Sequence, residues 1–575
     1  MSKIDKGFAP KWYEETPPAK SYRSILKWGD PNEFKHPNAR LYELMKSTFN
    51  MTDADFGQKE KMGLERVAFN LPISITKEQI DTFKQIVGEE NILEDEYSRL
   101  QVAYGKTMID LMRLREGIVE NVPDIVIHPR DKEDIKKIVE YCNHEKINVY
   151  VYAGGSSVTR GVECTKTGIS LNMSVHMNKV IKFNETNQTI TVEPGMSGPA
   201  LEKTLNSAKQ LFHAKRAYTC GHFPQSFEYS CVGGWVVTRG AGQNSTYFGK
   251  IEDIVICQEY VTPAGIIKTE AYPASATGPS IDEIMMGSEG AYGILVSVTL
   301  KIFRYMPENQ RKFSYMFKNW QDAMNAAREI MQGQFGFPSV FRLSDPEETD
   351  VAMKLYGVED TLVDKLLELK GFKKGEKCMF LGFTDGEAAF TKVVKRNVHR
   401  ICKNYGAMYT TKYVTARWEK GRFKDPYMRE DMQDFGIMTD TLECAVSWDI
   451  VKEVHAGVRA FCKSRPNTLC MTHMSHAYPQ GANLYFIFIA KINQIDEYLD
   501  YQNGILDHIQ KYGAAMSHHH GIGKMTAPWL EDQIGKNQME VFRALKKHFD
   551  PNNIMNPGGT IGLDLPDEQK RKVQA

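Results

Sequence analysis

The sequence predicts an α+β protein built from more than one domain. Its 575 residues exceed what a single hydrophobic core usually organises, so two or three domains are expected. Short runs rich in valine and isoleucine alternate with amphipathic helical patterns along most of the chain. Four glycine-rich loops lie between residues 153 and 293, within one such α+β stretch. These observations place a ligand-binding α+β unit in the first half and further α+β structure in the second.

Composition excludes several classes of protein. Lys plus Arg number 72 and Asp plus Glu number 72, so no overall field attracts nucleic acid. The 10 cysteines are scattered without a C-x-x-C pair, which argues against zinc ribbons and dithiol redox motifs. No apolar run approaches the roughly 18 residues that a membrane span needs, and residues 1–7 lack a secretory signal. We expect a soluble protein of a reducing compartment.

Residues 1–120 are expected to form a mainly helical N-terminal region. Leu100, Tyr104, Met108 and Leu111 recur at helical spacing, which predicts one helix over residues 96–115. Packing against a core explains this helix without any functional role.

Residues 121–305 are expected to form the ligand-binding α+β domain. A buried strand at 125–127 precedes a helix capped by Asp131, whose apolar face includes Ile135 and Ile138. A second strand at 149–152 then leads directly into a glycine loop. The runs 180–183 and 189–192 flank a turn and predict a hairpin.

Residues 306–510 are expected to form a second α+β domain, a cap with strands at 379–382 and 484–489. Residues 511–575 are expected to return to the first domain and complete the active site. They carry a histidine-rich tract and a predicted helix from 532 to 549.

The glycine loops favour a bound diphosphate. Glycine lets backbone N–H groups approach an anion closely because no Cβ stands in the way. One such loop is explained as well by a tight turn, but four in one region are better explained by a diphosphate held jointly. The stretch 240–245 departs from G-x-G-x-x-G by ending in serine, and no P-loop or H-E-x-x-H motif occurs, so Rossmann, P-loop and zincin proteins are excluded.

His518, His519 and His520, followed by Gly-Ile-Gly-Lys, form the most unusual tract of the chain. Adjacent imidazoles beside flexible backbone suit anion binding or proton transfer near neutral pH. A solvated turn or an incidental metal site is the alternative.

Several motifs resemble the vanillyl-alcohol-oxidase-type (PCMH-type) FAD-binding fold: PDIVIHP at 123–129, AGGSS at 153–157, VEPG at 192–195 and GSEG at 287–290. Within that superfamily the chain resembles the alkyldihydroxyacetonephosphate synthase family. This narrower resemblance rests on LKWGD at 26–30, SFEYSCVGGW at 226–235, YMR at 427–429, LYF at 484–486, HHHGIGK at 518–524 and DPNNI at 550–554. Ala153 stands where the family usually has a further glycine.

The resemblance implies a bound FAD. No histidine lies between His144 and His176, near the first glycine loop, so the FAD is expected to be non-covalent. The implied cofactor-binding residues are Val151, Tyr152, Ala153, Gly154, Gly155, Ser156, Ser157, Gln225, Ser226, Phe227, Glu228, Tyr229, Ser230, Cys231, Thr238, Arg239, Gly240, Ala241, Gly287, Ser288, Glu289, Gly290, Ala291, Tyr292 and Gly293. Asn556 is implied as a further important residue, and no metal is expected.

The resemblance also implies a reaction. The acyl group of acyl-dihydroxyacetone phosphate would be exchanged for a long-chain fatty alcohol, through a covalent adduct at flavin N5 and without net oxidation. Tyr485 would be the base, with His518, His519 and His520 as further catalytic groups. Arg429 and Arg342 would bind substrate; Arg429 and the histidines would lower the Tyr485 pKa. Burial on a strand is the structural alternative for Tyr485, and a surface ion pair for Arg429.

The resemblance also implies an apolar tunnel, a membrane contact, an oligomeric state and a cellular location. The long chains imply an apolar tunnel in the cap, for which Phe486, Phe488 and Phe335 are candidates, and peripheral membrane contact. A homodimer is implied, as is a peroxisomal location. The ending KVQA at 572–575 is not a peroxisomal tripeptide, so a cytoplasmic location is the alternative.

Two other functions stay open. A flavin dehydrogenase for a 2-hydroxy acid such as D-lactate would keep the fold, although the unbroken histidine run does not match the spaced metal-binding histidines it would favour. A catalytically silent flavin- or lipid-binding protein is the second alternative.

Overall fold

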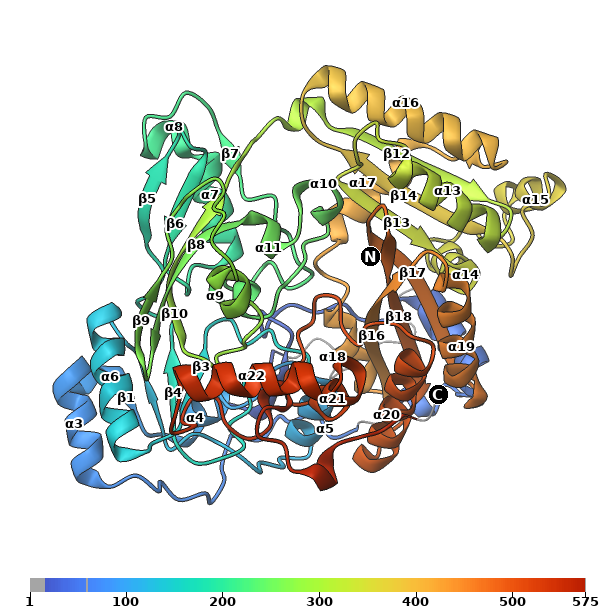
Figure 1. The fold of residues 1–575 in the computed structure, drawn as a ribbon. Helices are drawn as coiled ribbons and strands as arrows, with labels where there is room; N and C mark the ends of the chain where they lie inside the picture. The colour runs from blue at the N-terminus through green and yellow to red at the C-terminus, as the bar shows by residue number, and fades with distance from the viewer. Residues whose placement is uncertain (1–15, 58–59, 574–575) are drawn as a thin grey trace.

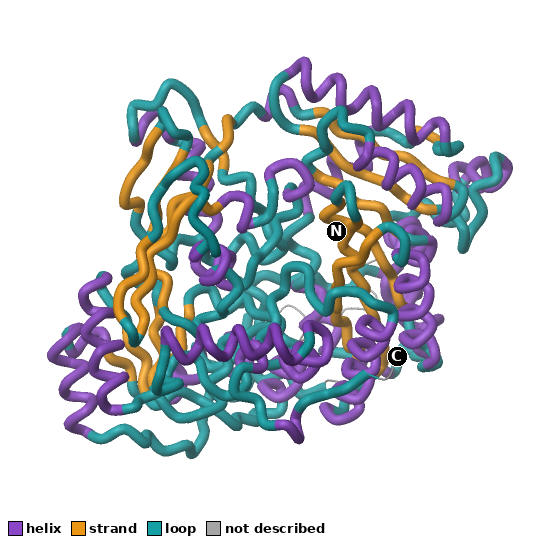
Figure 2. Tube along the Cα trace, in the orientation of Figure 1, coloured by secondary structure: helices purple, strands orange, loops and turns teal. Residues whose placement is uncertain are grey.

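The computed structural model describes residues 16–57 and 60–573. The segments at 1–7 and 574–575, on which the targeting expectations partly rest, lie outside the described residues. Figures 1 and 2 show sheets on opposite sides of the molecule, with loops filling the space between them.

The first half of the chain contains two larger sheets and one two-stranded pair. The four-stranded sheet has the order β1 (Ile92–Leu93), β2 (Ile125–Ile127), β4 (Ile169–Asn172) and β3 (Val149–Tyr152), with β2, β4 and β3 parallel. The five-stranded antiparallel sheet has the order β5 (Val180–Asn184), β6 (Thr189–Val192), β10 (Ile294–Lys301), β8 (Val255–Thr262) and β9 (Gly265–Lys268). The predicted hairpin is therefore β5–β6, and the predicted strands 125–127 and 149–152 are confirmed.

Helices join these strands, and α3 (Lys77–Val87) and α6 (Lys132–Glu145) pack with the four-stranded sheet in one hydrophobic core. The predicted Asp131-capped helix is α6, whose buried face includes Ile135 and Ile138, as expected. The others are α7 (Gly198–Asn206), α8 (Ala208–Leu211), α9 (Val232–Val237), α10 (Ser245–Phe248), α11 (Ile251–Ile254) and α12 (Ile281–Met285). A small pair, β7 (Tyr218–Thr219) and β11 (Phe303–Arg304), closes this half.

The second half is organised by a seven-stranded antiparallel sheet. Its order is β15 (Met408–Tyr409), β12 (Arg311–Phe317), β14 (Cys378–Thr384), β13 (Val340–Ser344), β17 (Leu469–Ala477), β18 (Gly481–Lys491) and β16 (Ile437–Ser447). The strands predicted at 379–382 and 484–489 are parts of β14 and β18.

The two faces of this sheet are covered differently. On one face, α13 (Trp320–Gln332), α16 (Ala388–Asn404), α19 (Val451–Ser464) and α20 (Ile495–Lys511) pack into the largest hydrophobic core. On the other face lie α2 (Ala39–Phe49), α14 (Pro346–Leu355), α15 (Leu362–Leu369), α17 (Lys412–Gly421) and α18 (Tyr427–Gln433). The second face borders the functional cavity described below.

The helix predicted over 96–115 is interrupted. The chain forms α4 (Glu96–Gln101) and α5 (Met108–Arg115), and α5 starts with a capping box between Thr107 and Asp110. A Cβ at Gly105 would lie 2.3 Å from the carbonyl oxygen of Ser157, so this turn presses the chain against the first glycine loop. The apolar residues keep helical spacing across residues 102–107, so the sequence pattern wrongly predicted one continuous helix.

The helix predicted over 532–549 is also two helices. It is divided into α21 (Ala527–Ile534) and α22 (Lys536–Phe549) at Gly535, whose φ is +86°. That conformation is accessible to glycine and ends the first helix.

A buried ion cluster joins the N-terminal helices to the cap. Nη1 and Nη2 of Arg23, on α1 (Tyr22–Leu26), each donate to Asp434 at 2.8 Å, and Arg115 donates to the same carboxylate at 2.6 Å. All three side chains are at most 4% exposed. Burial opposes ionisation of Asp434, but the two arginines outweigh it and lower the pKa of the carboxyl group.

Replacing Asp434 by asparagine should therefore destabilise the protein strongly. Arg115 would lose its carboxylate partner and Arg23 the nearer of its two, keeping only Asp431 at 3.8 Å. Removing the partner of a buried charge typically costs about 3–5 kcal/mol. Urea unfolding followed by tryptophan fluorescence measures the effect. Asp567→Asn, which removes an exposed partner of Lys570, is the control and should leave the midpoint unchanged. An unchanged midpoint in Asp434→Asn would contradict this account.

Candidate functional site

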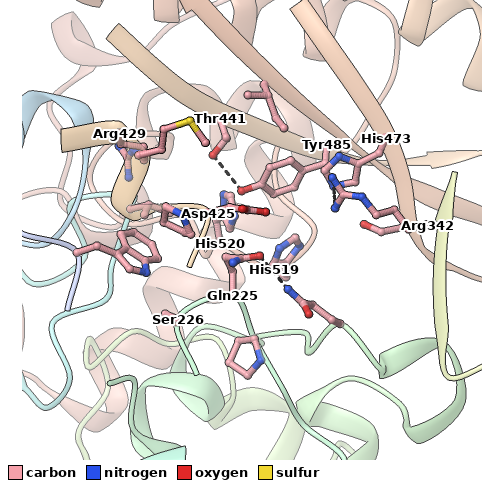
Figure 3. Close-up of a pocket in the computed structure, with 18 of the residues that line it drawn as sticks. Gln225, Ser226, Arg342, Asp425, Arg429, Thr441, His473, Tyr485, His519 and His520 are labelled. Atoms are coloured by element: carbon pink, nitrogen blue, oxygen red, sulfur yellow. Dashed lines mark hydrogen bonds between the residues drawn. The ribbon is translucent and has the colours of Figure 1, made fainter. Parts of the chain in front are cut away.

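One large cavity, of about 900 Å³, lies between the glycine loops and the cap sheet. The loop after β3, the segment before α9, the loop after α9 and the turn before β10 supply one wall. Strands β13, β17, β18 and β16 supply the opposite wall. Figure 3 shows Gln225 and Ser226 on the loop side and Tyr485, His473 and Arg342 on the sheet side.

The expected cofactor residues divide into two groups. Those that line the cavity are Val151, Ala153, Gly154, Gly155, Ser156, Ser157, Gln225, Ser226, Cys231, Thr238, Gly240, Ala241, Glu289, Gly290 and Gly293. Those outside its lining are Tyr152, Phe227, Glu228, Tyr229, Ser230, Arg239, Gly287, Ser288, Ala291 and Tyr292. Several of the second group support the loops: Phe227, Ala291 and Tyr292 pack in a core, and Ser230 accepts a hydrogen bond from Trp235.

Residues outside the expected set also line the cavity. They are Pro194, in the segment between β6 and α7, and Gly233, Gly234 and Trp235, on α9. The glycine pair belongs to one of the four clusters expected to hold a diphosphate, although it was not among the individually named cofactor residues.

The glycine loops can accept a large anionic group. A Cβ at Gly154 would lie 2.5 Å from the carbonyl oxygen of Tyr229, so the two loops touch only because this residue is glycine. A Cβ at Gly234 would meet nothing within 4 Å. Within residues 16–57 and 60–573, the backbone N–H groups of Gly155, Ser156 and Ser157 have no protein acceptor. These features fit a cofactor diphosphate.

Tyr485 lies on the cap wall of the cavity. Its hydroxyl donates to Thr441 Oγ1 at 3.1 Å, and its ring stacks on His473 with a 4.8 Å centroid distance (Figure 3). The rings of His519 and His520 lie 6.2 and 5.6 Å from it. The predicted Tyr485, His519 and His520 are therefore together at the cavity. The third predicted histidine, His518, does not line the cavity and instead contacts the Tyr478 hydroxyl through Nε2 at 2.6 Å.

The histidine tract is held by a buried glutamate that the sequence analysis missed. The carboxylate of Glu443, 2% exposed, accepts the backbone N–H groups of His518, His519 and His520 at 2.9–3.1 Å. The Ser517 hydroxyl and the Asn483 amide donate to it as well. On β16, Glu443 lies directly opposite Tyr485, so the register places both at the same level of the sheet.

Burial sets the protonation of this cluster. It lowers the pKa of His520 to about 3 and that of His518 well below the ordinary value, so both imidazoles are neutral at pH 7. Burial would raise the pKa of Glu443, but the charge and hydrogen bond of His519 outweigh it and keep that pKa well below its usual range.

The expected lowering of the Tyr485 pKa is wrong for the ligand-free protein. Burial raises the pKa of the phenol above its ordinary value, more than Thr441 and Arg429 lower it. Arg429 is already engaged: it donates to Asp440 at 3.0 Å and to two backbone carbonyls. The surface ion pair considered for Arg429 is wrong too, since the arginine is 6% exposed and lines the cavity.

Arg342 also reaches the cavity, through contacts that the sequence did not reveal. It pairs with Glu348 and lies 3.2 Å from His473 Nε2, while His473 Nδ1 lies 3.2 Å from the same glutamate. Arg342, Glu348 and His473 therefore form one group beside Tyr485. The sequence did contain one indication of the position of His473. Leu469, Met471 and His473 alternate along a strand, and residues at this spacing share one face of the sheet.

The residues that follow the three histidines, 521–524, contact the glycine-loop wall of the cavity. Glu289 accepts the N–H groups of Ile522 and Gly523, and burial raises its pKa to about 7. Lys524 donates to Asn556 at 2.9 Å, and the Asn556 amide donates to the Glu289 carbonyl at 2.6 Å. Asn556 thus supports the loop wall without lining the cavity.

The expected tunnel residues were assigned to the wrong face. On β18, Tyr485, Ile487 and Ile489 line the cavity, whereas Phe486 and Phe488 point into the opposite core. Side chains alternate along a strand, so a one-residue shift exchanges the faces. Phe335 also packs against that core.

Among the residues that the structure describes, one group of side chains is close enough to hold a metal ion. Ligand atoms of Glu443, His518 and His519 lie within 4.8 Å of one another. The glutamate already accepts backbone N–H groups, so a metal would compete with the tract's own hydrogen bonds. The absence of a metal stays a prediction.

Two protein families match this chain, one over the residues of the glycine-loop wall and one over the residues of the cap-sheet wall. Residues 123–270 match the family described as FAD binding domain, and residues 306–560 match FAD linked oxidases, C-terminal domain. The chain therefore has the architecture of an FAD-linked oxidase, with FAD as its cofactor, and the predicted PCMH-type fold is confirmed. A solved p-cresol methylhydroxylase is similar in fold, with a TM-score of 0.62 and 16% identity over 86% of this chain and 99% of that one.

The narrower resemblance is confirmed as well. Alkyldihydroxyacetonephosphate synthases of Dictyostelium discoideum and Trypanosoma brucei brucei are 28% and 27% identical, covering 81% and 94% of this chain and 78% and 90% of the relatives. A solved alkyldihydroxyacetonephosphate synthase superposes with a TM-score of 0.79 and 24% identity, over 93% of this chain and 99% of that one. A mitochondrial D-lactate dehydrogenase of Arabidopsis thaliana is 22% identical over 85% of this chain and 80% of its own.

Removing the Glu443 charge should loosen the histidine tract. Glu443→Gln would lose charge-assisted hydrogen bonds to several buried N–H groups and should lower the free energy of unfolding by about 3 kcal/mol at pH 7. Because the folded-state pKa is depressed, this contribution is complete above about pH 4.3, the unfolded value, and is lost as pH falls through the folded pKa. Thermal unfolding from pH 8 to 4 measures it.

The difference between wild type and Glu443→Gln should hence stay constant from pH 8 to about pH 5. Glu376→Gln, at an exposed glutamate, is the control. A difference that vanishes already near pH 6 would show that Glu443 is protonated there, contrary to this electrostatic account.

Proposed function

We propose that this protein is an FAD-dependent alkylglycerone-phosphate synthase of ether lipid biosynthesis. It would exchange the acyl chain of acyl-dihydroxyacetone phosphate for a long-chain fatty alcohol, releasing a fatty acid. The observation that supports this most is the composition of one cavity. The Tyr485 phenol, two arginines and the imidazoles of His519 and His520 line the same cavity as the glycine loops. Apolar side chains line the rest of that cavity.

The polar residues suit this exchange. The guanidinium groups of Arg342 and Arg429 can bind a phosphate or a departing carboxylate by planar, bidentate hydrogen bonds. An arriving phosphate also raises the pKa of the neutral histidines, because nearby negative charge favours imidazolium. His520, which is neutral in the ligand-free protein, can in this way gain a proton as substrate binds.

Tyr485 is proposed as the base that takes a proton beside the substrate ketone. The raised pKa means that the phenol is protonated in the free protein, so only a small fraction is reactive at pH 7. FAD, held by the loop wall, supplies a nucleophilic ring nitrogen for the exchange when it is bound.

The same proposal assigns the parts of the chain. Residues 121–305 form the flavin-binding domain, 306–510 the cap, and 511–575 the segment that joins them, after the N-terminal region 1–120. A homodimer and a peroxisomal location stay predictions from family resemblance.

The direct test is ether formation by purified holoprotein from acyl-dihydroxyacetone phosphate and labelled hexadecanol. We expect labelled alkyl product from wild type, and a loss of about 10²–10⁴-fold in Tyr485→Phe, the range for removal of a general base. FAD absorbance checks that the variant keeps its cofactor. Thr410→Val, a change of another hydroxyl at the cavity, is the matched control and should keep most of the activity.

The alternatives give different outcomes. Reduction of a dye acceptor by D-lactate at a useful rate, without ether product, would favour the 2-hydroxy-acid dehydrogenase. Retention of both FAD and lipid with no turnover of either substrate pair would favour the silent binding protein.

We also propose that α15 forms the peripheral membrane contact. Its side chains Leu362, Leu366 and Leu369 are 79%, 57% and 84% exposed, although leucine is usually buried. Val363 and Leu367 of the same helix line the cavity. No helix in the described ranges has the length and hydropathy to cross a membrane. A lipid surface would cover this helix while the cavity stays open to it, and Figure 1 shows α15 at the edge of the molecule.

Charged substitution on this helix should weaken membrane binding. Leu362→Asp/Leu369→Asp should reduce binding to phosphatidylserine–phosphatidylcholine vesicles at least about tenfold, because each leucine contributes roughly 1.5–3 kcal/mol when buried. Vesicle flotation measures this. Val541→Asp, at an exposed apolar residue on α22, is the control. Equal losses in both proteins would argue against α15.

A further inference from the structure

The helix α14 lies between two separate hydrophobic clusters, both of which border the apolar part of the cavity. It begins beside the polar centre, where Glu348 in its first turn contacts Arg342 and His473. From there Val351 and Leu355 pack with the helix α2 and one part of the cap sheet. Met353 packs instead with Met316 and Leu367, in a separate hydrophobic cluster. Residues 351 and 355 share one side of a helix, and residue 353 lies on the other.

The first arm lies over strands β17 and β18. Cross-strand pairs continue outward from the reactive group: His473 pairs with Tyr485, Met471 with Ile487, and Leu469 with Ile489. All six side chains line the cavity. The helix α2 covers this arm with Leu41 and Met45, which are 6% and 0% exposed, so the arm is closed on its outer side.

The second arm lies over strands β12, β14 and β13. Arg342 pairs with Leu381 next to the polar centre, and Met316 pairs with Met379 farther along. Leu367 of α15 and Trp418 of α17 cover it. This arm ends at the exposed face of α15.

We propose that each arm holds one aliphatic chain, so that the acyl and alkyl chains of the exchange occupy different sites. This inference rests on the proposed synthase function for the identity of the chains, but not for the existence of two sites. Both arms are lined by methionine and aliphatic side chains, and both meet at Arg342, His473 and Tyr485. A chain anchored at the polar centre can therefore extend to either side of α14. Chains from a lipid surface enter by the second arm.

The first test counts bound chains. Delipidated holoprotein is incubated with palmitate and hexadecanol, and native mass spectrometry measures the chains bound per FAD. We expect two per wild-type protein and one in each of Met471→Trp and Met379→Trp, which fill the first and second arm by the same chemical change. A single chain in wild type, or loss of both chains in one variant, would overturn the proposal.

The second test separates the substrates. The chain-length dependence of kcat/KM is measured for the alcohol and for the acyl group. One variant should lower kcat/KM for hexadecyl relative to octyl chains by at least about tenfold for one substrate, and the other variant for the other substrate. Shifts of the same substrate in both variants would mean that one arm serves both chains in turn.

The two failures are distinguishable. If wild type forms no ether product, the proposed function fails, while the number of bound chains still decides the two arms. FAD absorbance and the unfolding midpoint identify variants that do not fold. Met471→Phe and Met379→Phe then replace them, because phenylalanine is closer to methionine in volume.

Discussion

The Glu443 carboxylate is the interaction on which the polar centre depends. Three successive backbone N–H groups of the histidine tract point at this one buried side chain. Without a buried acceptor, those groups would each carry a desolvation cost of about 1–3 kcal/mol. Glu289 has the same role for Ile522 and Gly523 on the loop wall. A single loop is thereby fixed to both walls of the cavity, and its imidazoles are held between them.

The charges of the site are largely matched before any substrate arrives. Arg429 faces Asp440, and Arg342 faces Glu348. Glu443 accepts the backbone N–H groups of the tract and lies 3.4 Å from His519 Nδ1. Buried charges require such partners, because desolvation otherwise outweighs their attraction. The phenol of Tyr485 responds to burial more than to these neighbours, and its pKa rises. An anionic substrate would shift this balance by placing negative charge between groups that are now neutral or paired.

The sheet connects this chemistry to the apolar arms. Along β17 and β18 the same alternation that presents His473 and Tyr485 to the cavity presents Met471 and Ile487 farther out. A reactive centre and a chain-binding surface are thus consecutive positions on one face. The helix α14 extends from the same centre, so its two sides decide which part of the sheet a chain can reach.

The sequence by itself determined the strands and helices with strong local periodicity, such as β3, β18 and α6, and the glycine loops that suit a diphosphate. Family resemblance then brought Tyr485, Arg429 and the histidines together as candidates. Local pattern could not reveal the break at Gly105, whose cause is a contact with Ser157, or the face to which Phe486 and Phe488 belong. Glu443, Glu348 and His473 acquire their roles from strand register and from segments far apart in the chain. Only the tertiary structure decided those contacts and the direction of the Tyr485 pKa shift, because desolvation and charge pairing depend on what packs around a group rather than on its neighbours in sequence.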